Sequence, residues 1–466
     1  MSGPTLPDLL SGSAFALRTA ADEVTGAELV ADARRMVGGL AELAPGDGVL
    51  IDVVDARAAL TVAIAAWWNG LRVGFTRRDS PLDVVAQAQA LCASIVVVDG
   101  PAPRAVRTGV AVCPVRALIG APATGQPVCR PDGPALDLLT SGTTGRPKGI
   151  VMSHAAMVAN AAALATAMDL GRRDRLWTSL PATSPGALAT VILAAAVRGA
   201  TAVLSRAGGP AGAVAEVVAV QPTVVYAVPE VYAWLSRSPA AGGAPGVRWW
   251  LSSSSALTPE RFDRMRAGWG ALVRSFYCAS ELGTVTFNDS DDPDVVRGGV
   301  GRPLPGVRLT VADPSVPGGP GRLVVGGELV ASGVRTEAGF RAFPAEGICT
   351  EDRGFLDAAG RLVLTGREED RIHVGSEVVD PQLVEACLQT HPAVIGCIVV
   401  ARPHALLGSV LEARVVRRAG VEATARELVL LCRRAGLRGG WVPRSIRWVG
   451  AVPTTSAGKP DRQVLG

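Results

Sequence analysis

Lysine, histidine and paired cysteines are scarce in this sequence of 466 residues. Two lysines, Lys148 and Lys459, stand among 46 basic residues, and there are four histidines. The eight cysteines include no Cys-x-x-Cys pair, so we expect reduced, mostly buried thiols rather than a disulfide framework. The histidine spacings match no metal-site pattern. These absences argue against a zinc hydrolase and against any metal site built from protein ligands alone.

Long apolar runs and blocks of like charge are also missing. The longest apolar stretches, such as Ala187 to Val197, fall short of the roughly 20 residues that a membrane helix needs, and the start lacks a signal-peptide pattern. The 46 basic and 42 acidic residues are spread along the whole chain, which leaves no electrostatic footprint for nucleic acid. We therefore expect a cytoplasmic globular protein without a membrane span and without a nucleic-acid partner.

The scarcity of lysine draws attention to the two that remain. Arginine can replace lysine on a solvated surface, but not where a compact ammonium must fit against a phosphate in a confined site. An arginine-favouring composition could also leave two lysines at random positions. The sequence around each lysine decides between these readings.

The hydrophobic pattern predicts an α/β protein of two domains, since one core rarely supports a chain of this length. Short β-branched runs at 49–54, 94–99, 136–141, 201–205, 222–228, 248–253 and 272–277 are strand candidates. They alternate with helical stretches such as 81–93 and 187–198, which favours layers of parallel sheet and helices. Residues 303–327 are rich in Gly and Pro and predict a β-rich subdomain. We divide the chain into a large domain (1–366), a hinge (367–370) and a small mobile α+β domain (371–466), in which we expect helices at 381–388 and 423–434 and strands at 395–400 and 411–416.

Residues 137–149 read DLLTSGTTGRPKG and form the most informative motif. An apolar strand leads into a run of Thr, Ser and Gly that ends at Lys148, and residues 150–164 follow in helical register. Such a loop can wrap phosphates through close backbone approach at glycine, hydroxyl donors and an ammonium. The candidate residues are Thr140, Ser141, Gly142, Thr143, Thr144, Gly145 and Lys148. It is not a Walker A loop; the alternative is an ordinary flexible turn.

This motif resembles the signature loop of the adenylate-forming superfamily, which includes acyl-CoA and aryl-CoA ligases, peptide-synthetase adenylation domains and luciferases. Further motifs of that family follow in the expected order, namely FYCASE, CTEDRG, LTGREEDRI and VPTTSAGKPDRQVL. The resemblance runs from about Ala58 to the C-terminus. Both lysines fall on motif positions that need an ammonium.

The resemblance implies a role for each matching residue. The signature loop would hold the β- and γ-phosphates of ATP. Tyr277 would stack on adenine, Ser280 contact the α-phosphate, Glu281 hold Mg²⁺, Asp352 accept hydrogen bonds from the ribose, Arg367 contact the nucleotide, Glu369 act as the pivot and Lys459 act as the catalytic lysine. The implied reaction is ATP-dependent conversion of a carboxylic acid to an acyl adenylate with release of pyrophosphate, followed by acyl transfer after the small domain has rotated.

Several positions depart from the family pattern around the expected acyl pocket. Cys278 replaces a glycine, serines occupy a Gly-Gly-Ala position, and Ser184 stands where many relatives carry histidine. The pocket residues we expect are Ser184, Tyr226, Ser252, Ser253, Ser254 and Cys278. Their hydroxyls suit a polar or small substrate, although serines could equally replace glycines in a turn.

Two substitutions bear on the second acceptor. His373 occupies the usual lysine position of the hinge loop, and Ser376 replaces the glycine that lines the pantetheine tunnel in thioester-forming relatives. Coenzyme A is the co-substrate we favour, and an amine, a carrier-protein thiol or nitrite (a diazotase), in secondary metabolism, are the alternatives. A nucleotide-binding protein without catalysis is a third interpretation, against which Lys459, Glu281 and Asp352 argue.

Overall fold

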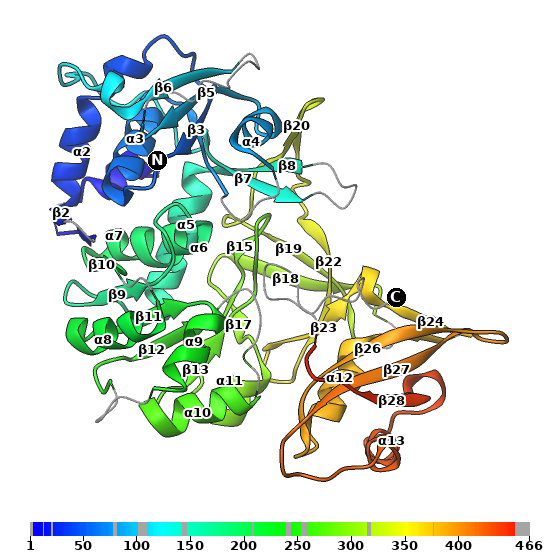
Figure 1. The fold of residues 1–466 in the computed structure, drawn as a ribbon. Coiled ribbons are helices and arrows are strands. Elements are labelled where there is room, and N and C mark those ends of the chain that lie inside the picture. The colour runs from blue at the N-terminus through cyan, green and yellow to red at the C-terminus, as the bar shows by residue number, and fades with distance from the viewer. Residues whose placement is uncertain are drawn as a thin grey trace.

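The computed structural model describes residues 3–12, 14–19, 22–77, 82–100, 110–141, 147–206, 209–238, 244–252, 257, 259–314, 318–375 and 377–452. A large domain carries two layered sheets, a β-rich subdomain follows, and a small domain forms the other end of the molecule (Figure 1). This mixed α/β architecture with a small C-terminal domain confirms the predicted fold class.

The first sheet of the large domain has the strand order β21-β20-β8-β7-β4-β3-β5-β6. Its strands are β21 (Gly339–Ala342), β20 (Gly333–Thr336), β8 (Pro147–Ser153), β7 (Pro134–Ser141), β4 (Arg72–Phe75), β3 (Gly48–Asp52), β5 (Ala93–Val98) and β6 (Ala111–Pro114). Strands β7, β4, β3, β5 and β6 pair in parallel, whereas β8 and β20 pair antiparallel. The phosphate-loop motif therefore lies in a hairpin at one side of a parallel sheet.

The second sheet has the order β13-β12-β11-β9-β10-β1-β2. Its strands are β13 (Val273–Ser275), β12 (Trp249–Ser252), β11 (Val224–Ala227), β9 (Arg175–Thr178), β10 (Thr201–Leu204), β1 (Ala16–Arg18) and β2 (Glu23–Thr25). All pair in parallel except β2. The carboxyl ends of parallel strands are where ligands bind in such sheets.

Helices cover and separate the two sheets (Figure 1). They are α1 (Leu6–Leu10), α2 (Gly26–Arg34), α3 (Ala56–Trp68), α4 (Val84–Ala90), α5 (His154–Ala167), α6 (Pro185–Ala187), α7 (Ala194–Arg198), α8 (Pro210–Val220), α9 (Pro229–Leu235), α10 (Pro259–Trp269) and α11 (Pro293–Gly298), with 3₁₀ turns at Val37–Leu40 and Val115–Leu118. The largest hydrophobic cluster joins side chains of both sheets with those of α3, α5 and α7. A second cluster lies under α8, α9 and α10 on the other face of the second sheet.

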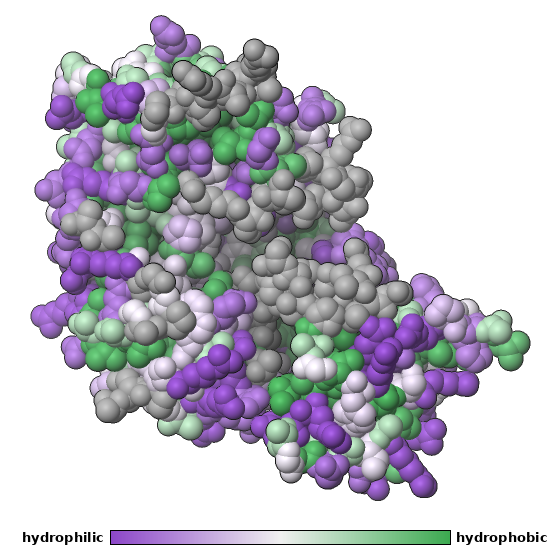
Figure 2. Space-filling view, in the orientation of Figure 1, coloured by the Kyte–Doolittle hydropathy of each residue, from purple (hydrophilic) through white to green (hydrophobic). Residues whose placement is uncertain are grey.

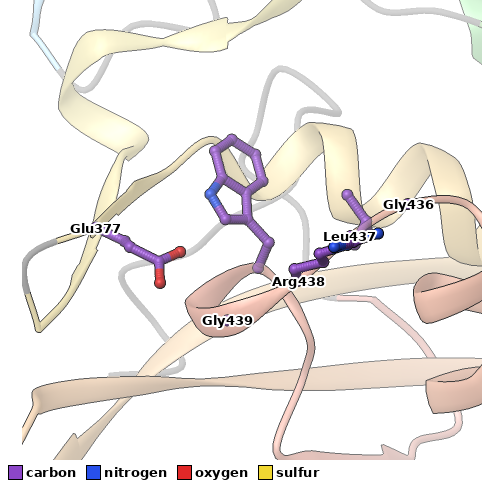
Figure 3. A pocket seen from close by; sticks show the side chains of 6 residues that line it. Glu377, Gly436, Leu437, Arg438 and Gly439 are labelled. Atoms are coloured by element: carbon purple, nitrogen blue, oxygen red, sulfur yellow. The ribbon is translucent and has the colours of Figure 1, made fainter.

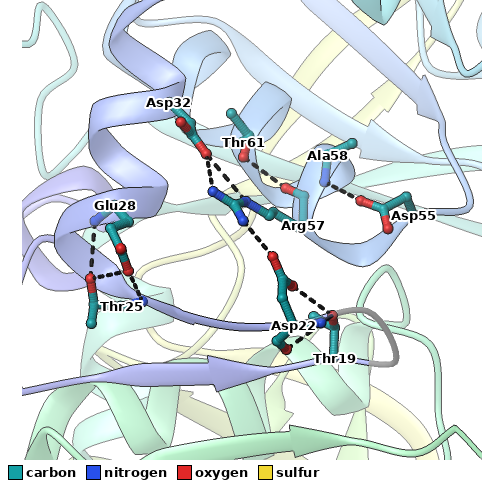
Figure 4. Close-up of polar contacts among 9 residues, drawn as sticks. All are labelled: Thr19, Asp22, Thr25, Glu28, Asp32, Asp55, Arg57, Ala58 and Thr61. Carbon is teal, nitrogen blue, oxygen red and sulfur yellow. Dashed lines mark hydrogen bonds and ion pairs between the residues drawn. The ribbon is translucent and has the colours of Figure 1, made fainter.

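A polar cluster joins the N-terminal elements to α3 (Figure 4). The Arg57 guanidinium pairs with Asp22 and lies 2.7 Å from Asp32 Oδ2 on α2. The hydrogen bonds that Arg57 donates to Asp32 and Asp22 raise its pKa. Thr25 and Glu28 form a capping box that begins α2, as expected for that spacing.

Two helical predictions are corrected. Residues 150–153 form the end of strand β8 rather than helix, because β-branched Ile150 and Val151 pair with β7 and β20, and Ser153 then caps α5 by accepting from Ala156 N at 3.1 Å. The predicted helix at 187–198 is interrupted by a π-helix at Leu188–Leu193.

The predicted burial of the cysteines is also corrected. All eight are free thiols, but Cys92, Cys278 and Cys349 are exposed. Cys92 lies in the turn after α4, Cys278 begins β14, and Cys349 is the second residue of β22.

The β-rich subdomain begins with short hairpins and continues as an antiparallel sheet of order β18-β19-β22-β23. Its strands are β14 (Cys278–Ala279), β15 (Gly283–Thr284), β16 (Thr286–Phe287), β17 (Arg302–Pro303), β18 (Val307–Ala312), β19 (Gly321–Gly327), β22 (Ile348–Leu356) and β23 (Leu362–Arg367). It confirms the β-rich segment predicted near 303–327.

The small domain follows a 3₁₀ turn at Glu368–Asp370, which coincides with the predicted hinge. Its elements are β24 (Ile372–Val374), β25 (Glu377–Val379), α12 (Pro381–Gln389), β26 (Val394–His404), β27 (Gly408–Arg417), α13 (Ala425–Arg434), a 3₁₀ turn at Gly439–Trp441 and β28 (Ser445–Trp448). The predicted helices and strands are all present, and both strands are longer than predicted. The division at 367–370 itself stays a prediction.

Hydrophilic and hydrophobic residues are interspersed on the face shown in Figure 2, as the even charge distribution of the sequence suggests. None of the helices in the described part of the chain has the length and apolar character to cross a bilayer.

Candidate active site

The β7–β8 hairpin brings together Thr140 and Lys148, the first and last of the loop residues predicted to bind phosphate. Thr140 pairs with Lys148 across the two strands, and the Thr140 hydroxyl donates to the Lys148 carbonyl at 3.5 Å. Residues paired across an antiparallel ladder share one face of the sheet. Lys148 Nζ lies 3.4 Å from Glu281 Oε1, with both side chains partly exposed. Two motifs 133 positions apart in the sequence therefore meet at this pair.

Glu281 is held by the backbone around it. It follows β14 in a tight hairpin whose strands pair Cys278 with Thr284. The Glu281 carbonyl accepts from Ala331 N at 2.9 Å. Ser280 is half-buried beside it, and Cys278 is exposed. The hairpin thus fixes the backbone from which the Glu281 side chain extends.

A second group of predicted residues converges on Asp352. The Tyr277 hydroxyl donates to Asp352 Oδ2 at 2.6 Å, and Arg367 Nε lies 3.2 Å from Asp352 Oδ1. The backbone N–H of Asp352 donates to Thr350 Oγ1 at 3.1 Å. Both carboxylate oxygens of Asp352 therefore have a donor. Thr350 lies inside the CTEDRG motif but was not among the predicted site residues.

The protonation of this group follows from burial and charge. Burial, together with the neighbouring Asp352 carboxylate, raises the pKa of Tyr277 well above its usual range, so the phenol stays a donor. Burial lowers the pKa of Arg367, but Asp352, Glu369 and Asp370 outweigh that effect and raise it. Arg367 also pairs with Glu369, the predicted pivot. Asp352, which is predicted to bind ribose, is thus linked to Glu369 through one arginine.

An ion-pair cluster at the hinge was not predicted. Arg353 of β22 lies 2.7 Å from Glu368 Oε2, and Arg371 Nη1 lies 2.9 Å from Glu368 Oε1. Asp380, at the start of α12, is 3.3 Å from Arg371 Nε and 3.9 Å from Arg353 Nε. These four residues, which we call the hinge cluster, join the large domain, the hinge and the small domain.

The residues predicted for the acyl pocket divide between two faces of the second sheet. Tyr226 is buried on β11, and Ser184 caps α6 by accepting from Ala187 N at 3.2 Å. Ser252 pairs with Ala227 rather than with Tyr226, so by strand alternation it lies on the opposite face. Its hydroxyl is fully buried and lacks a hydrogen-bond partner among the described residues.

Some predicted residues lie outside the described residues. They are Gly142, Thr143, Thr144, Gly145, Ser253, Ser254, Ser376 and Lys459. Ser141 ends β7. The roles predicted for Ser141 and for these eight residues stay predictions.

The donor set suits a magnesium ion shared with phosphates better than one enclosed by protein. Among the described residues no group of three or more His, Cys, Asp and Glu side chains could hold a metal. Glu281 offers one partly exposed carboxylate, and Mg²⁺ is usually bound by one or two carboxylates together with substrate phosphates and water. The residues present therefore fit the predicted ion.

A separate hollow lies in the small domain (Figure 3). It is lined by Glu377, Gly436, Leu437, Arg438, Gly439 and Trp441. Gly440 N donates to Glu377 Oε2 at 3.2 Å, which ties the hinge loop to the segment after α13. No residue predicted for the nucleotide lines it.

Two family models cover most of the sequence. The model described as AMP-binding enzyme matches residues 11–334, and the model for the C-terminal domain of AMP-binding enzymes matches residues 383–459. The chain belongs to the AMP-binding enzyme family. This places it in the adenylate-forming superfamily, as the motifs predicted.

Characterised relatives of this AMP-binding enzyme use different acids. It is 30% identical over 347 residues to sulfoacetate–CoA ligase of Cupriavidus necator, covering 73% of this chain and 68% of that protein. It is 31% identical over 433 residues to salicyl-AMP ligase / salicyl-S-ArCP synthetase of Mycobacterium tuberculosis, covering 88% and 72%.

Solved structures extend the similarity to the whole chain. Apo MatB from Rhodopseudomonas palustris superposes with a TM-score of 0.84 at 25% identity, over 100% of this chain and 98% of that one. Amide bond synthetase McbA from Marinactinospora thermotolerans gives 0.82 at 25% identity, over 98% and 97%. The AMP-binding enzyme described here is thus an AMP-forming ligase that uses ATP to activate a carboxylic acid for transfer to an acceptor.

Proposed function

We propose that this AMP-binding enzyme transfers its activated acyl group to coenzyme A, and that Lys148, Glu281, Tyr277, Asp352, Arg367 and Lys459 carry the reaction. The observation that supports these roles is convergence. Lys148 and Glu281 meet as an ion pair, while Tyr277 and Arg367 both donate to Asp352. Segments distant in the sequence thus supply an ammonium, a carboxylate, an aromatic ring and a ribose acceptor within one region.

The first half-reaction needs positive charge more than acid or base chemistry. A carboxylate oxygen attacks the α-phosphorus of ATP, and the bond to the bridging oxygen of the β-phosphate breaks, so that pyrophosphate leaves. Both reactants are anions, so the transition state is stabilised by cationic groups and by positioning. Lys148 would neutralise the departing pyrophosphate, and Lys459 would bridge the attacking carboxylate and the α-phosphate.

The nucleoside is held by the group around Asp352. Tyr277 would present its ring to adenine, while its hydroxyl and the Arg367 guanidinium fix the Asp352 carboxylate for the ribose hydroxyls. Mg²⁺ on Glu281 would supply charge neutralisation of the triphosphate. Glu281 would exchange its contact with Lys148 for that ion, which frees the ammonium for phosphate.

The second half-reaction forms the thioester. The thiol of coenzyme A loses its proton to solvent, its sulfur attacks the acyl carbon, and AMP leaves with the electron pair of the broken C–O bond. We propose that the small domain rotates about Glu369 between the two steps, which removes Lys459 and brings the loop of His373 and Ser376 to the site.

A different acceptor is the second candidate, and specific observations favour it. His373 and Ser376 depart from the pattern of thioester-forming relatives, one relative is named as a salicyl-S-ArCP synthetase, and one structural neighbour is named as an amide bond synthetase. A carrier-protein thiol, an amine or nitrite would attack the same acyl adenylate.

One screen tests both candidates. Pyrophosphate release is measured with ATP and a panel of aryl, short-chain and long-chain acids, alone and then with coenzyme A, with amines, with nitrite and with a carrier protein. Thioester formed with coenzyme A supports the first candidate. Adenylate formed without thioester, but consumed by another acceptor, replaces it with the second.

A lysine variant tests the assigned roles. Lys459→Ala should reduce pyrophosphate release by about 10²-fold or more, since removal of one preorganised electrostatic group typically costs that much. Arg462→Ala, in the same segment, is the matched control and should retain activity. Full adenylation by Lys459→Ala would refute the catalytic role.

A further inference from the structure

The loop that carries His373 is built into the core of the small domain. It forms the hairpin of β24 and β25, and Ile372, Val374 and Val379 of these strands belong to the hydrophobic cluster of the small domain. His373 lies between two of them and is exposed, as alternation along a strand requires. One face of the hairpin is therefore anchored in the core, and the other face carries His373 outward.

The first strand of this hairpin is braced by the turn between β26 and β27. Gly375 N donates to the Leu407 carbonyl at 2.8 Å, and the Ser409 hydroxyl donates to the His373 carbonyl. Gly375 has a φ of +60°, a conformation that glycine adopts without strain. Two hydrogen bonds from different parts of the small domain thus fix the backbone on either side of Val374.

The second strand is braced by Glu377, which lines the hollow in the small domain (Figure 3). Glu377 Oε2 accepts from Gly440 N at 3.2 Å. Gly439 has a φ of +56°, and a Cβ atom on this residue would overlap with the Glu377 carboxylate. A Cβ atom on residue 440 would lie 2.9 Å from Val374 Cβ. Two consecutive glycines therefore let the 3₁₀ turn after α13 approach the hairpin closely enough for this bond.

These braces differ from the hinge cluster in what they connect. The hinge cluster joins the two domains, whereas both braces join parts of the small domain to each other. The hairpin can therefore move with the small domain as one body. A loop that became ordered only at the moment of acyl transfer would lose conformational entropy in that step, and a loop that is already ordered does not.

We propose that Glu377 and Ser409 are positioning residues for acyl transfer, because they hold the hairpin in the shape that meets the acyl adenylate after domain rotation. Neither side chain has to contact substrate, since each acts through the backbone that it braces. The inference rests on the proposed function, because it assumes that rotation brings the His373 loop to the site. Adenylation precedes that rotation, so it should not depend on either brace.

The test measures the two half-reactions separately. Pyrophosphate release with ATP and a carboxylic acid that the enzyme accepts reports adenylation. Single-turnover conversion of the preformed acyl adenylate to thioester with coenzyme A reports transfer. In Glu377→Ala and in Ser409→Ala the transfer rate should fall by about three- to tenfold, as is typical for the loss of one hydrogen bond, while pyrophosphate release stays within about twofold of wild type.

A rescue variant and two controls separate positioning from general loosening. Glu377→Gln keeps an acceptor oxygen for Gly440 N and should transfer at nearly the wild-type rate. Glu422→Ala removes an exposed glutamate that lies 3.4 Å from Arg417 in the same domain, and Ser445→Ala removes an exposed serine from β28. Neither control should change either half-reaction.

Hydrogen exchange gives a readout that does not depend on activity. Backbone amides of residues 372–379 should exchange faster in Glu377→Ala and Ser409→Ala than in wild type, in Glu377→Gln or in the two controls, because a hairpin that loses a brace opens more often. Amides of the large domain should exchange at the wild-type rate in all of these proteins, since both braces lie within the small domain.

The outcomes separate this inference from the proposed function. Wild-type transfer in one alanine variant removes that residue from the proposal. Wild-type transfer in both, or an equal loss of adenylation and transfer, overturns the inference and leaves the proposed function intact. Each variant tests its own brace, so if one does not fold the other decides. Pyrophosphate release without thioester in the wild type overturns coenzyme A as the acceptor and, with it, the inference.

Discussion

Buried arginine–carboxylate pairs occur in two regions of this enzyme, and they are made differently. Within the first sheet, Arg72 pairs with Asp137, and both side chains are almost fully buried. The Arg72 guanidinium also donates to the carbonyls of Gly46 at 2.7 Å and Cys92 at 3.1 Å. Burial, with the nearby Arg335 charge, lowers the pKa of Arg72 to about 10, so the group stays charged at neutral pH.

The hinge cluster is less completely satisfied. Three of its buried atoms, Arg353 Nε, Arg371 Nε and Asp380 Oδ1, lack hydrogen-bond partners among the described residues, against one atom, Asp137 Oδ1, in the sheet pair. Burial raises the pKa of Asp380 in spite of the two arginines, whereas Arg371 and Arg353 outweigh burial at Glu368 and lower its pKa. The difference suggests that the pair in the sheet stabilises the fold, while the hinge cluster holds one domain orientation and can be rearranged.

The largest effect should come from breaking the pair in the sheet. Asp137→Ala should lower the free energy of unfolding by about 3 to 5 kcal/mol, because it leaves the Arg72 charge buried without a partner. Chemical denaturation of the variant and the wild type measures this change in the free energy of unfolding. The double variant Arg72→Met with Asp137→Leu should recover much of the loss, since apolar groups of similar size remove the uncompensated charge. A loss under about 1 kcal/mol for Asp137→Ala would contradict the contrast drawn here.

A buried neutral group in the same domain sharpens the comparison. His154 is 1% exposed, and its Nδ1 accepts from Leu6 N at 3.3 Å. Burial lowers its pKa from 6.5 to about 4. Below pH 6.5 the unfolded chain binds a proton that the folded protein does not, so stability falls as pH drops from 6.5 toward 4, by about 3 kcal/mol in total.

The variant His154→Gln isolates this contribution, because it keeps an acceptor for Leu6 N and does not titrate. Unfolding free energies of variant and wild type are compared between pH 4 and 7. The difference should shrink or reverse toward the acid end as the wild type loses stability. Parallel curves would show that His154 does not titrate as its burial implies.

Tyr277→Phe addresses the link between nucleotide and hinge. Removing the hydroxyl that donates to Asp352 should raise KM for ATP by about tenfold, as expected for a hydrogen bond to a charged group. It should also reduce the preference for ATP over 2′-deoxy-ATP, since a less fixed Asp352 selects the ribose less well. An unchanged preference together with a raised KM would assign Tyr277 to ring stacking alone.

The smallest effect on stability should come from the hinge cluster. Arg371→Gln should change the free energy of unfolding by under about 1 kcal/mol, because the side chain is partly exposed and shares its partners with Arg353. The ratio of adenylation rate to acyl-transfer rate should nevertheless change, because one domain orientation loses a contact. Arg402→Gln, which breaks a pair with Glu412 of 3.3 Å within the small domain, should leave that ratio unchanged. Equal ratios in all three proteins would remove the distinction between the two kinds of pair.

Local patterns predicted the elements well where periodicity and composition act over a few residues. The alternation of β-branched runs with alanine-rich stretches anticipated both parallel sheets, and Gly and Pro marked the β-rich segment. Residues 150–153 were misjudged because apolar residues suit a helix or a strand, and pairing with β7 and β20 decided the outcome. Tertiary pairing of this kind leaves no trace in a short window.

The candidate nucleotide residues, whose roles stay predictions, were predictable as a group from short motifs that resemble those of the family. Their partners were not. Thr350 and Arg353 lie inside the CTEDRG motif, but the motif does not show which side chains they contact, and nothing in the sequence around Asp380 predicts its contacts with Arg353 and Arg371. Ser252 was predicted to line the same pocket as Tyr226, but it lies on the other face of the sheet. A shift of one residue along a strand moves a side chain from one face to the other, and the sequence alone does not fix this register.

The contact between Lys148 and Glu281 has a consequence for how substrate enters. The Lys148 ammonium and the Glu281 carboxylate lie 3.4 Å apart, so each charge already has a partner within the protein. In the proposed reaction the triphosphate would pair with the Lys148 ammonium and Mg²⁺ with the Glu281 carboxylate, so the two together would replace both halves of this ion pair. On the same proposal, metal-free ATP that paired with Lys148 would leave the Glu281 carboxylate unpaired beside a polyanion, so we expect ATP to bind more tightly together with Mg²⁺ than without it.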